Sequence, residues 1–136
     1  MEKRNFQSKH PDTGKEFFKQ SGNNQFVFLS IKHLQSNFEC FSDWTKQELA
    51  KFWNFNKRLH QMTWNDIYET GGKKDKTGLA YTIIPKEKYR SIPFISALND
   101  VTLFELRIDD KLRVHGYRSN SIFYMCLLDR EHKICK

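Results

Sequence analysis

The stretch that decides the fold is LRVHGYRSNSIFYMCLLDREH, residues 112–132. It predicts two strands joined by a polar turn, because apolar residues alternate through its first half and run almost unbroken through its second. In the first strand, Leu112, Val114 and Gly116 share one side. The other side then holds a guanidinium, an imidazole and a phenol, contributed by Arg113, His115 and Tyr117.

The composition suits one globular domain. The chain has 136 residues, and its 12 Phe, 5 Tyr and 3 Trp provide enough large apolar surface for a core. No stretch approaches the roughly 18 consecutive apolar residues that a membrane span needs. The first ten residues, MEKRNFQSKH, lack the apolar segment of a secretory signal. We therefore expect a cytoplasmic protein with no membrane partner.

The cysteines and histidines do not form a recognisable metal pattern. Three cysteines, an odd number without Cys-x-x-Cys spacing, indicate reduced thiols in a reducing compartment. His132 and Cys135 have the spacing of half a metal site, but no second pair of ligands lies near them in the sequence. The sequence therefore predicts no metal site and no cofactor.

The charge balance points to a polyanionic partner. With 23 Lys and Arg against 16 Asp and Glu, the net charge is +7. This surplus favours RNA, DNA or an acidic protein, although solubility alone would also explain it. Residues 71–78, GGKKDKTG, predict a basic loop that would contact phosphates without reading a base sequence. Its lysines are Lys73, Lys74 and Lys76.

We divide the chain into a polar N-terminal extension at 1–25 and a single α+β domain at 26–136. In the extension, Thr13 and Glu16 form a capping-box pattern that predicts one short helix. The sequence QFVFLSIKHL at 25–34 is rich in Phe, Val and Ile without a helical period, and it predicts a buried strand.

Two helices should follow this strand. Thr45 and Glu48 form a capping box, and the apolar residues after them recur at helical spacing, which predicts a helix over 46–61. Thr63 begins a shorter helix that Gly71 and Gly72 close.

The sequence predicts mainly strands in the remainder of the chain. Residues 101–108, 111–118 and 121–128 predict an antiparallel β-meander, with a last short strand at 132–136. The expected fold is therefore a two-layer α+β domain with an N-terminal strand, two helices and then the meander.

Keeping one side of the meander buried predicts its register. Ile108 then pairs with Leu112 across a three-residue loop. This register sets Arg107 opposite Arg113, and Glu105 opposite His115. A tight turn at Ser119-Asn120 should set Tyr117 by Ile122 and His115 by Tyr124. The polar side of the meander would then gather Glu105, Arg107, Arg113, His115, Tyr117 and Tyr124.

Such a side suits a phosphodiester. Two arginines directly across a ladder repel each other unless an anion lies over them, and guanidinium groups bind phosphate oxygens in bidentate fashion. Cleavage of RNA through its 2′-hydroxyl needs a base, cations for the developing charge and an acid for the leaving oxygen. We predict His115 or Glu105 as the base, Arg107 and Arg113 as the clamp, and His132 as the acid. A second interpretation stays open, because solvent-exposed sheet faces are also rich in Arg, His and Tyr.

The same stretch resembles the RelE/ParE toxin superfamily, whose small domains have a strand, two helices and an antiparallel sheet. LRVHGYR, a turn, then IFYMCLLD and REHK are similar to the family's arginine-bearing strand followed by an apolar strand that ends in a basic residue. Arg113 falls where the ribonuclease members keep an arginine, and LLDREH resembles the Asp-x-His ending of HigB-type members with one extra residue. No C-terminal helix is expected to present a catalytic tyrosine, so Tyr117 or Tyr124 would take that role.

The resemblance implies a toxin that cleaves mRNA, often on the ribosome, and that a cognate antitoxin protein neutralises. The basic loop and two residues of the last hairpin, Arg118 and Tyr124, would then contact RNA. ParE-type members instead act on DNA gyrase through protein contacts, so a shared fold does not decide the activity. A module that binds nucleic acid or a host protein without catalysis is the alternative.

Overall fold

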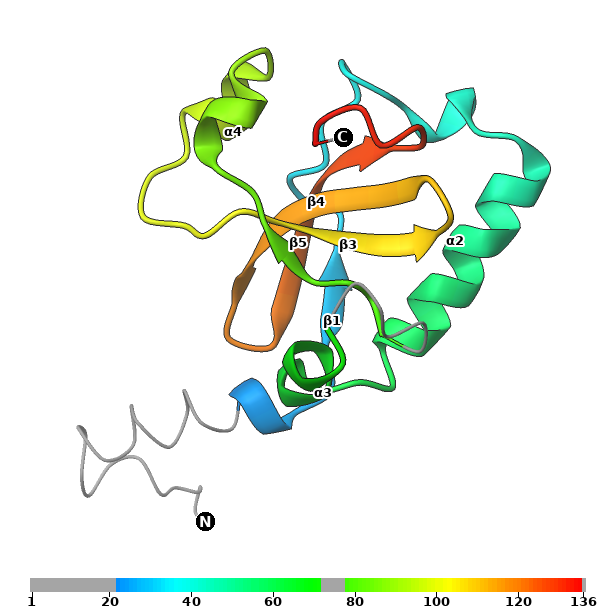
Figure 1. Cartoon of the computed structure of the whole chain (residues 1–136), viewed down its shortest axis with the longest axis vertical. Helices are drawn as coiled ribbons and strands as arrows, with labels where there is room; N and C mark the ends of the chain where they lie inside the picture. The colour runs from blue at the N-terminus through cyan, green and yellow to red at the C-terminus, as the bar shows by residue number, and fades with distance from the viewer. Residues whose placement is uncertain (1–21, 72–77, 136) are drawn as a thin grey trace.

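The computed structural model describes residues 22–71 and 78–135 (Figure 1). Within these ranges, five strands form one mixed sheet in the order β1-β5-β4-β3-β2. The strands are β1 (Phe28–Ser30), β2 (Thr82–Ile83), β3 (Phe104–Asp109), β4 (Leu112–Ser119) and β5 (Ile122–Asp129). Strand β1 runs parallel to β5, whereas the other neighbours are antiparallel. The predicted α+β class and its C-terminal meander are confirmed.

Both predicted helices are present, as α2 (Lys46–Leu59) and α3 (Trp64–Glu69). Reciprocal capping bonds begin α2: the Glu48 N–H donates to Thr45 Oγ1 over 3.1 Å, and the Thr45 N–H donates to Glu48 Oε1 over 2.8 Å. Thr63 and Asp66 begin α3 in the same way. None of the helices in the described ranges has the length and apolar character needed to cross a membrane.

Several short elements differ from the sequence prediction. The strand predicted over 25–34 is limited to β1, and residues 132–135 form no strand. Three short helical turns were not predicted: η2 (Phe41–Asp43), η3 (Lys86–Tyr89) and α4 (Pro93–Ser96). The helix predicted around Thr13 and the lysines of the basic loop lie outside the described residues.

The sheet has two unlike faces, and Figure 1 shows α2 and α4 on opposite sides of it. We call one the helix face, where apolar strand residues pack against α2 and α3. Its buried side chains include Phe55, Leu59, Trp64, Ile67, Phe104, Leu106, Val114, Phe123, Met125 and Leu128. We call the other the polar face, which the segment 84–103 covers in part. The covering side chains include Ile84, Tyr89, Ile92, Ile95 and Leu103.

The first hairpin confirms most of the predicted register. Arg107 lies opposite Arg113, and Glu105 lies opposite His115. The predicted three-residue loop is wrong, because Asp109 rather than Ile108 pairs with Leu112. The pairing shifts by one residue between 107 and 109. Ile108 therefore stays buried, and the loop between the two strands has two residues instead of three.

The second hairpin, between β4 and β5, also differs from the predicted register. Ser119 pairs with Ile122, so the turn is Asn120-Ser121, and Asn120 takes the left-handed conformation (φ 55°) that asparagine tolerates. Tyr117 therefore lies opposite Tyr124 instead of Ile122. A bulge then shifts the pairing, which sets His115 opposite Leu127 and Arg113 opposite Asp129.

Candidate functional site

A group of ionisable side chains lies buried on the polar face. Glu105 of β3, His115 of β4 and Asp129 at the end of β5 are 5%, 0% and 0% exposed. They lie together because β4 is the middle strand of the three, and because the bulge in β5 returns Asp129 to the side that His115 occupies. Burial of two carboxylates with one imidazole costs free energy unless each finds a partner.

His115 contacts three polar groups. Its Nε2 lies 3.3 Å from Asp129 Oδ2 and 3.6 Å from Glu105 Oε2. Its Nδ1 is hydrogen-bonded over 2.8 Å to the hydroxyl of Tyr89, which comes from the covering segment. Burial raises the pKa of Tyr89 well above the usual range, so this phenol remains protonated.

Asp129 also shapes the turn that follows β5. Its carboxylate accepts hydrogen bonds from the backbone N–H groups of Lys133 (2.8 Å) and Ile134 (3.0 Å). Burial alone would raise the pKa of Asp129, but the hydrogen bonds from His115 and these two N–H groups outweigh it and lower that pKa. The turn places His132 in the left-handed conformation (φ 57°), next to the buried group.

His132 extends the buried group toward solvent. Its Nε2 lies 3.2 Å from Glu105 Oε2, and its side chain is 29% exposed. Although this distance suits an ion pair, the geometry is not that of a hydrogen bond. In the described part of the chain, these two atoms are the buried side-chain N or O atoms that lack a hydrogen-bond partner. We refer to Glu105, His115, Asp129 and His132 as the acid–histidine cluster.

An arginine-lined hollow of about 370 Å³ adjoins the cluster. Arg107 donates to the Gly78 carbonyl over 3.0 Å, and Arg113 donates to the carbonyls of Asp110 and Leu112. Arg113 also links the hollow to the cluster, because its Nε lies 3.6 Å from Glu105 Oε1. We call this the arginine hollow; it is lined by Arg58, Gly78, Arg107, Ile108, Asp109, Asp110 and Arg113.

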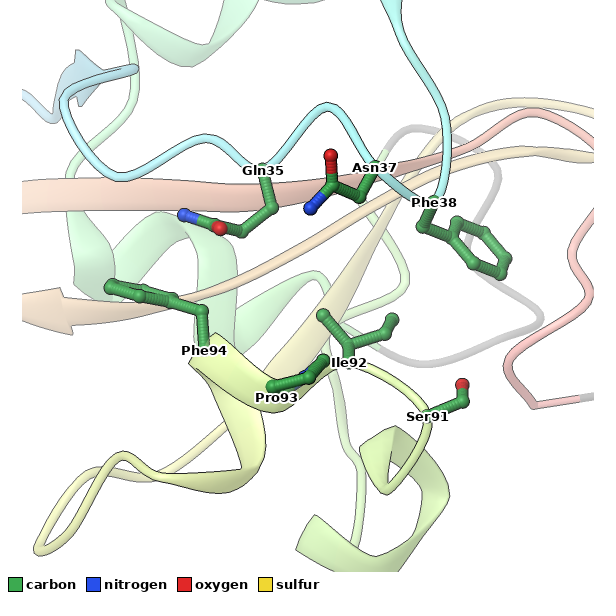
Figure 2. A pocket seen from close by; sticks show the side chains of 7 residues that line it. All are labelled: Gln35, Asn37, Phe38, Ser91, Ile92, Pro93 and Phe94. Carbon is green, nitrogen blue, oxygen red and sulfur yellow. The ribbon is translucent and has the colours of Figure 1, made fainter.

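Four half-buried rings form a row elsewhere on the polar face. Tyr117 stacks on Tyr124 with centroids 5.2 Å apart, His33 lies 5.3 Å from Tyr124, and Phe94 stacks on His33 at 5.7 Å. Phe94 also borders a groove between the loop after β1 and the covering segment (Figure 2). The groove is lined by Gln35, Asn37, Phe38, Ser91, Ile92, Pro93 and Phe94.

The structure brings together most of the residues predicted as catalytic and separates some of those predicted to bind RNA. Arg118 lies away from the polar face, with its guanidinium 4.9 Å from the centre of the Trp64 ring and bonded to Tyr68 Oη over 2.8 Å. Tyr124 lies beside Tyr117 as part of the aromatic row. Lys73, Lys74 and Lys76 lie outside the described residues.

The polar face is less open than the sequence suggests. Tyr89 and its neighbours cover His115 and Glu105, so both side chains are buried and do not face solvent. Asp129 and Tyr89 were missed as members of the site. Asp129 lies in the sequence LLDREH, but simple alternation without a bulge would place its side chain on the helix face of β5. No pattern in the sequence marked Tyr89 as a member of the site.

No protein-family model, curated protein or solved structure matches this chain.

Proposed function

We propose that this chain is a toxin-like endoribonuclease of the cytoplasm that cleaves mRNA, on or off the ribosome, without needing a metal ion, and that an antitoxin protein neutralises it. The observation that supports the proposal is the convergence of Arg107 and Arg113 on one hollow that adjoins the acid–histidine cluster. The toxin role and the antitoxin partner come from the resemblance to the RelE/ParE superfamily.

The arginine hollow suits the phosphodiester. Arg107 and Arg113 lie opposite each other on β3 and β4, and backbone carbonyls hold both guanidinium groups in place. Burial lowers the pKa of Arg113, but an arginine stays protonated at every physiological pH. The pair would therefore bind the phosphate oxygens and balance the charge that develops as the O2′–P bond forms.

Glu105 and His132 suit the two proton transfers. Because Glu105 is 95% buried, the 2′-hydroxyl would reach it through one water. The O2′–P bond forms as the proton moves through that water to Glu105, and the P–O5′ bond breaks as the leaving oxygen takes a proton from His132. The products are a 2′,3′-cyclic phosphate and a 5′-hydroxyl. After the reaction Glu105 releases its proton to water and the partly exposed His132 takes one back from water, which restores both groups.

The aromatic row suits the bases of single-stranded RNA. Half-buried rings that already stack on one another offer a surface on which unpaired bases can stack, and this contact tolerates any base sequence. The amides of Gln35 and Asn37 in the adjoining groove could bond to base edges (Figure 2).

The test is RNA cleavage by the purified full chain in EDTA. We expect Arg113→Ala to lower the cleavage rate by about 10²-fold or more, the scale on which loss of one charge-stabilising donor acts. Arg90→Ala is the matched control, since Arg90 is an exposed arginine outside the hollow, and it should cleave normally. Full cleavage by a folded Arg113→Ala protein would remove the proposed site.

A second candidate is a module that binds RNA without cleaving it. The burial of Glu105 and His115 favours this function, because a buried base is a poor acceptor for a substrate proton. It predicts RNA affinity that falls steeply between low and moderate salt, with no product formed in the same tubes. The cleavage assay therefore separates the two candidates directly.

A further inference from the structure

We propose that the acid–histidine cluster is also a binding site for a divalent transition-metal ion of the zinc class. The three central ligands would be Glu105, His115 and Asp129, whose ligand atoms all lie within 4.8 Å of one another. His132 would approach from the solvent side. Two imidazoles and two carboxylates are donors that zinc and its neighbours accept, and a divalent cation would neutralise both buried carboxylates.

The distances between these ligand atoms also fit a shared ion. Ligands placed about 2.0–2.1 Å from a tetrahedral ion lie about 3.3–3.4 Å from one another. From His115 Nε2 the two carboxylates are 3.3 and 3.6 Å away, and His132 Nε2 is 3.2 Å from Glu105 Oε2. Hydrogen bonds of this kind are usually shorter, about 2.7–2.9 Å.

The surrounding contacts orient these ligands as supporting groups do in metal sites. The Tyr89 hydroxyl is hydrogen-bonded to Nδ1 of His115. In the tautomer with the proton on Nδ1, the lone pair of Nε2 points toward the Asp129 carboxylate and is available to a metal ion. The N–H groups of Lys133 and Ile134 fix the Asp129 carboxylate. Both central side chains are therefore held in place before any ion arrives, which lowers the entropy cost of binding.

Two buried atoms without a hydrogen-bond partner are independent evidence that this site binds a ligand. Glu105 is 95% buried, yet its Oε2 accepts no hydrogen bond, and the facing Nε2 of His132 has no partner either. A buried polar atom without a hydrogen-bond partner destabilises the fold. An ion between them would satisfy both atoms at once. The partly exposed His132 side chain would give the ion its way in.

A bound proton is the competing explanation. A positively charged His115 could donate from Nε2 to a single carboxylate, but it would leave the other carboxylate and His132 unexplained. A metal ion accounts for all four side chains together. If the proposed nuclease function holds, the ion would also withdraw Glu105 and His132 from proton transfer, so metal binding and RNA cleavage would exclude each other.

The experiment is titration of the EDTA-treated full chain with Zn²⁺ by calorimetry, and with Co²⁺ by visible absorption, both without RNA. We expect saturable binding at this site and the strong visible bands of tetrahedral Co²⁺. Glu105→Gln and His132→Ala should each weaken binding by about 10-fold or more. His132→Ala is the safer variant for folding because its side chain lies partly in solvent, and circular dichroism checks each protein.

Matched controls assign the binding to the cluster. His33→Gln removes a histidine from the aromatic row, and Cys40→Ser and Cys135→Ser remove the two half-exposed thiols; all three should bind as the wild type does. Absence of binding, or wild-type affinity in both Glu105→Gln and His132→Ala, would overturn the proposal. RNA cleavage in EDTA is measured separately, so either proposal can fail without the other.

Discussion

The helix face and the polar face belong to the same three central strands, but they bury different chemistry. On the helix face, Trp64, Phe104 and Phe123 pack edge-to-face and stacked against one another within a cluster of buried apolar side chains. On the polar face, two carboxylates and an imidazole are each 5% exposed or less. Apolar burial stabilises a fold, whereas buried charge costs stability and is often retained at functional sites.

The comparison teaches where to look for function in this chain. If the helix face holds the fold together, changes there should lower the free energy of unfolding. If the polar face serves binding or catalysis, changes there should affect ligands more than stability. Two substitutions, one on each face, test this division, and a third at a partly exposed ion pair has the smallest expected effect on stability.

The largest effect is expected from Trp64→Ala on the helix face. Trp64 is fully buried, and its indole N–H donates to the Ser121 carbonyl over 3.2 Å. Removing the ring leaves a large cavity, so the free energy of unfolding in urea should fall by about 3–5 kcal/mol. Trp64→Phe fills most of the space and should cost clearly less. A loss below about 1 kcal/mol from Trp64→Ala would contradict the role given to this face.

A smaller effect is expected from Glu105→Gln on the polar face. The amide keeps the shape of the side chain and removes the repulsion between two carboxylates, while Arg113 keeps its contacts to the carbonyls of the turn. The free energy of unfolding should change by less than about 2 kcal/mol, although RNA cleavage and metal binding both fall. If urea denaturation shows a loss as large as that of Trp64→Ala, the polar face is structural.

The smallest effect is expected from Glu48, which joins α2 to the residue after β5. The hydrogen bond from the Thr45 N–H, and then the contact with Arg130, lower the pKa of Glu48 below its ordinary value of 4.5. A carboxyl with a lowered folded pKa stabilises the protein above its unfolded pKa, and this contribution is lost as the pH falls through the folded pKa.

Glu48→Gln tests that contribution. At neutral pH the variant should be less stable than the wild type by no more than about 1 kcal/mol, because the ion pair with Arg130 is partly exposed. Thermal melts of both proteins should converge as the pH is lowered below about 4. A difference that stays constant with pH would mean that the Glu48 charge contributes nothing.

The elements that sequence analysis predicted well are those defined by local signals. Capping boxes at Thr45 and Thr63 begin two helices at the expected residues, because a hydroxyl that binds a nearby N–H acts within one turn. Alternation likewise predicted the three meander strands and the pairing of Arg107 with Arg113. These features depend on neighbours within a few residues, so a single sequence contains them.

The site was only partly predictable from the sequence because it depends on two structural features that involve residues far apart in the chain. A bulge in β5 brings Asp129 to the side of His115, and bulges leave no clear mark in an alternating pattern. The segment 84–103 then folds over the polar face and buries His115 beneath Tyr89. Nothing in the periodicity of that segment indicated which surface it covers.

By itself, the sequence determined helices α2 and α3, the three central strands and the charges that two of those strands bring together, since each follows from short-range pattern and capping chemistry. Only the tertiary structure decided which of those charges stay in solvent and which are enclosed. Enclosure depends on contacts between residues far apart in the chain, and it turns a row of polar side chains into a buried cluster beside an arginine hollow.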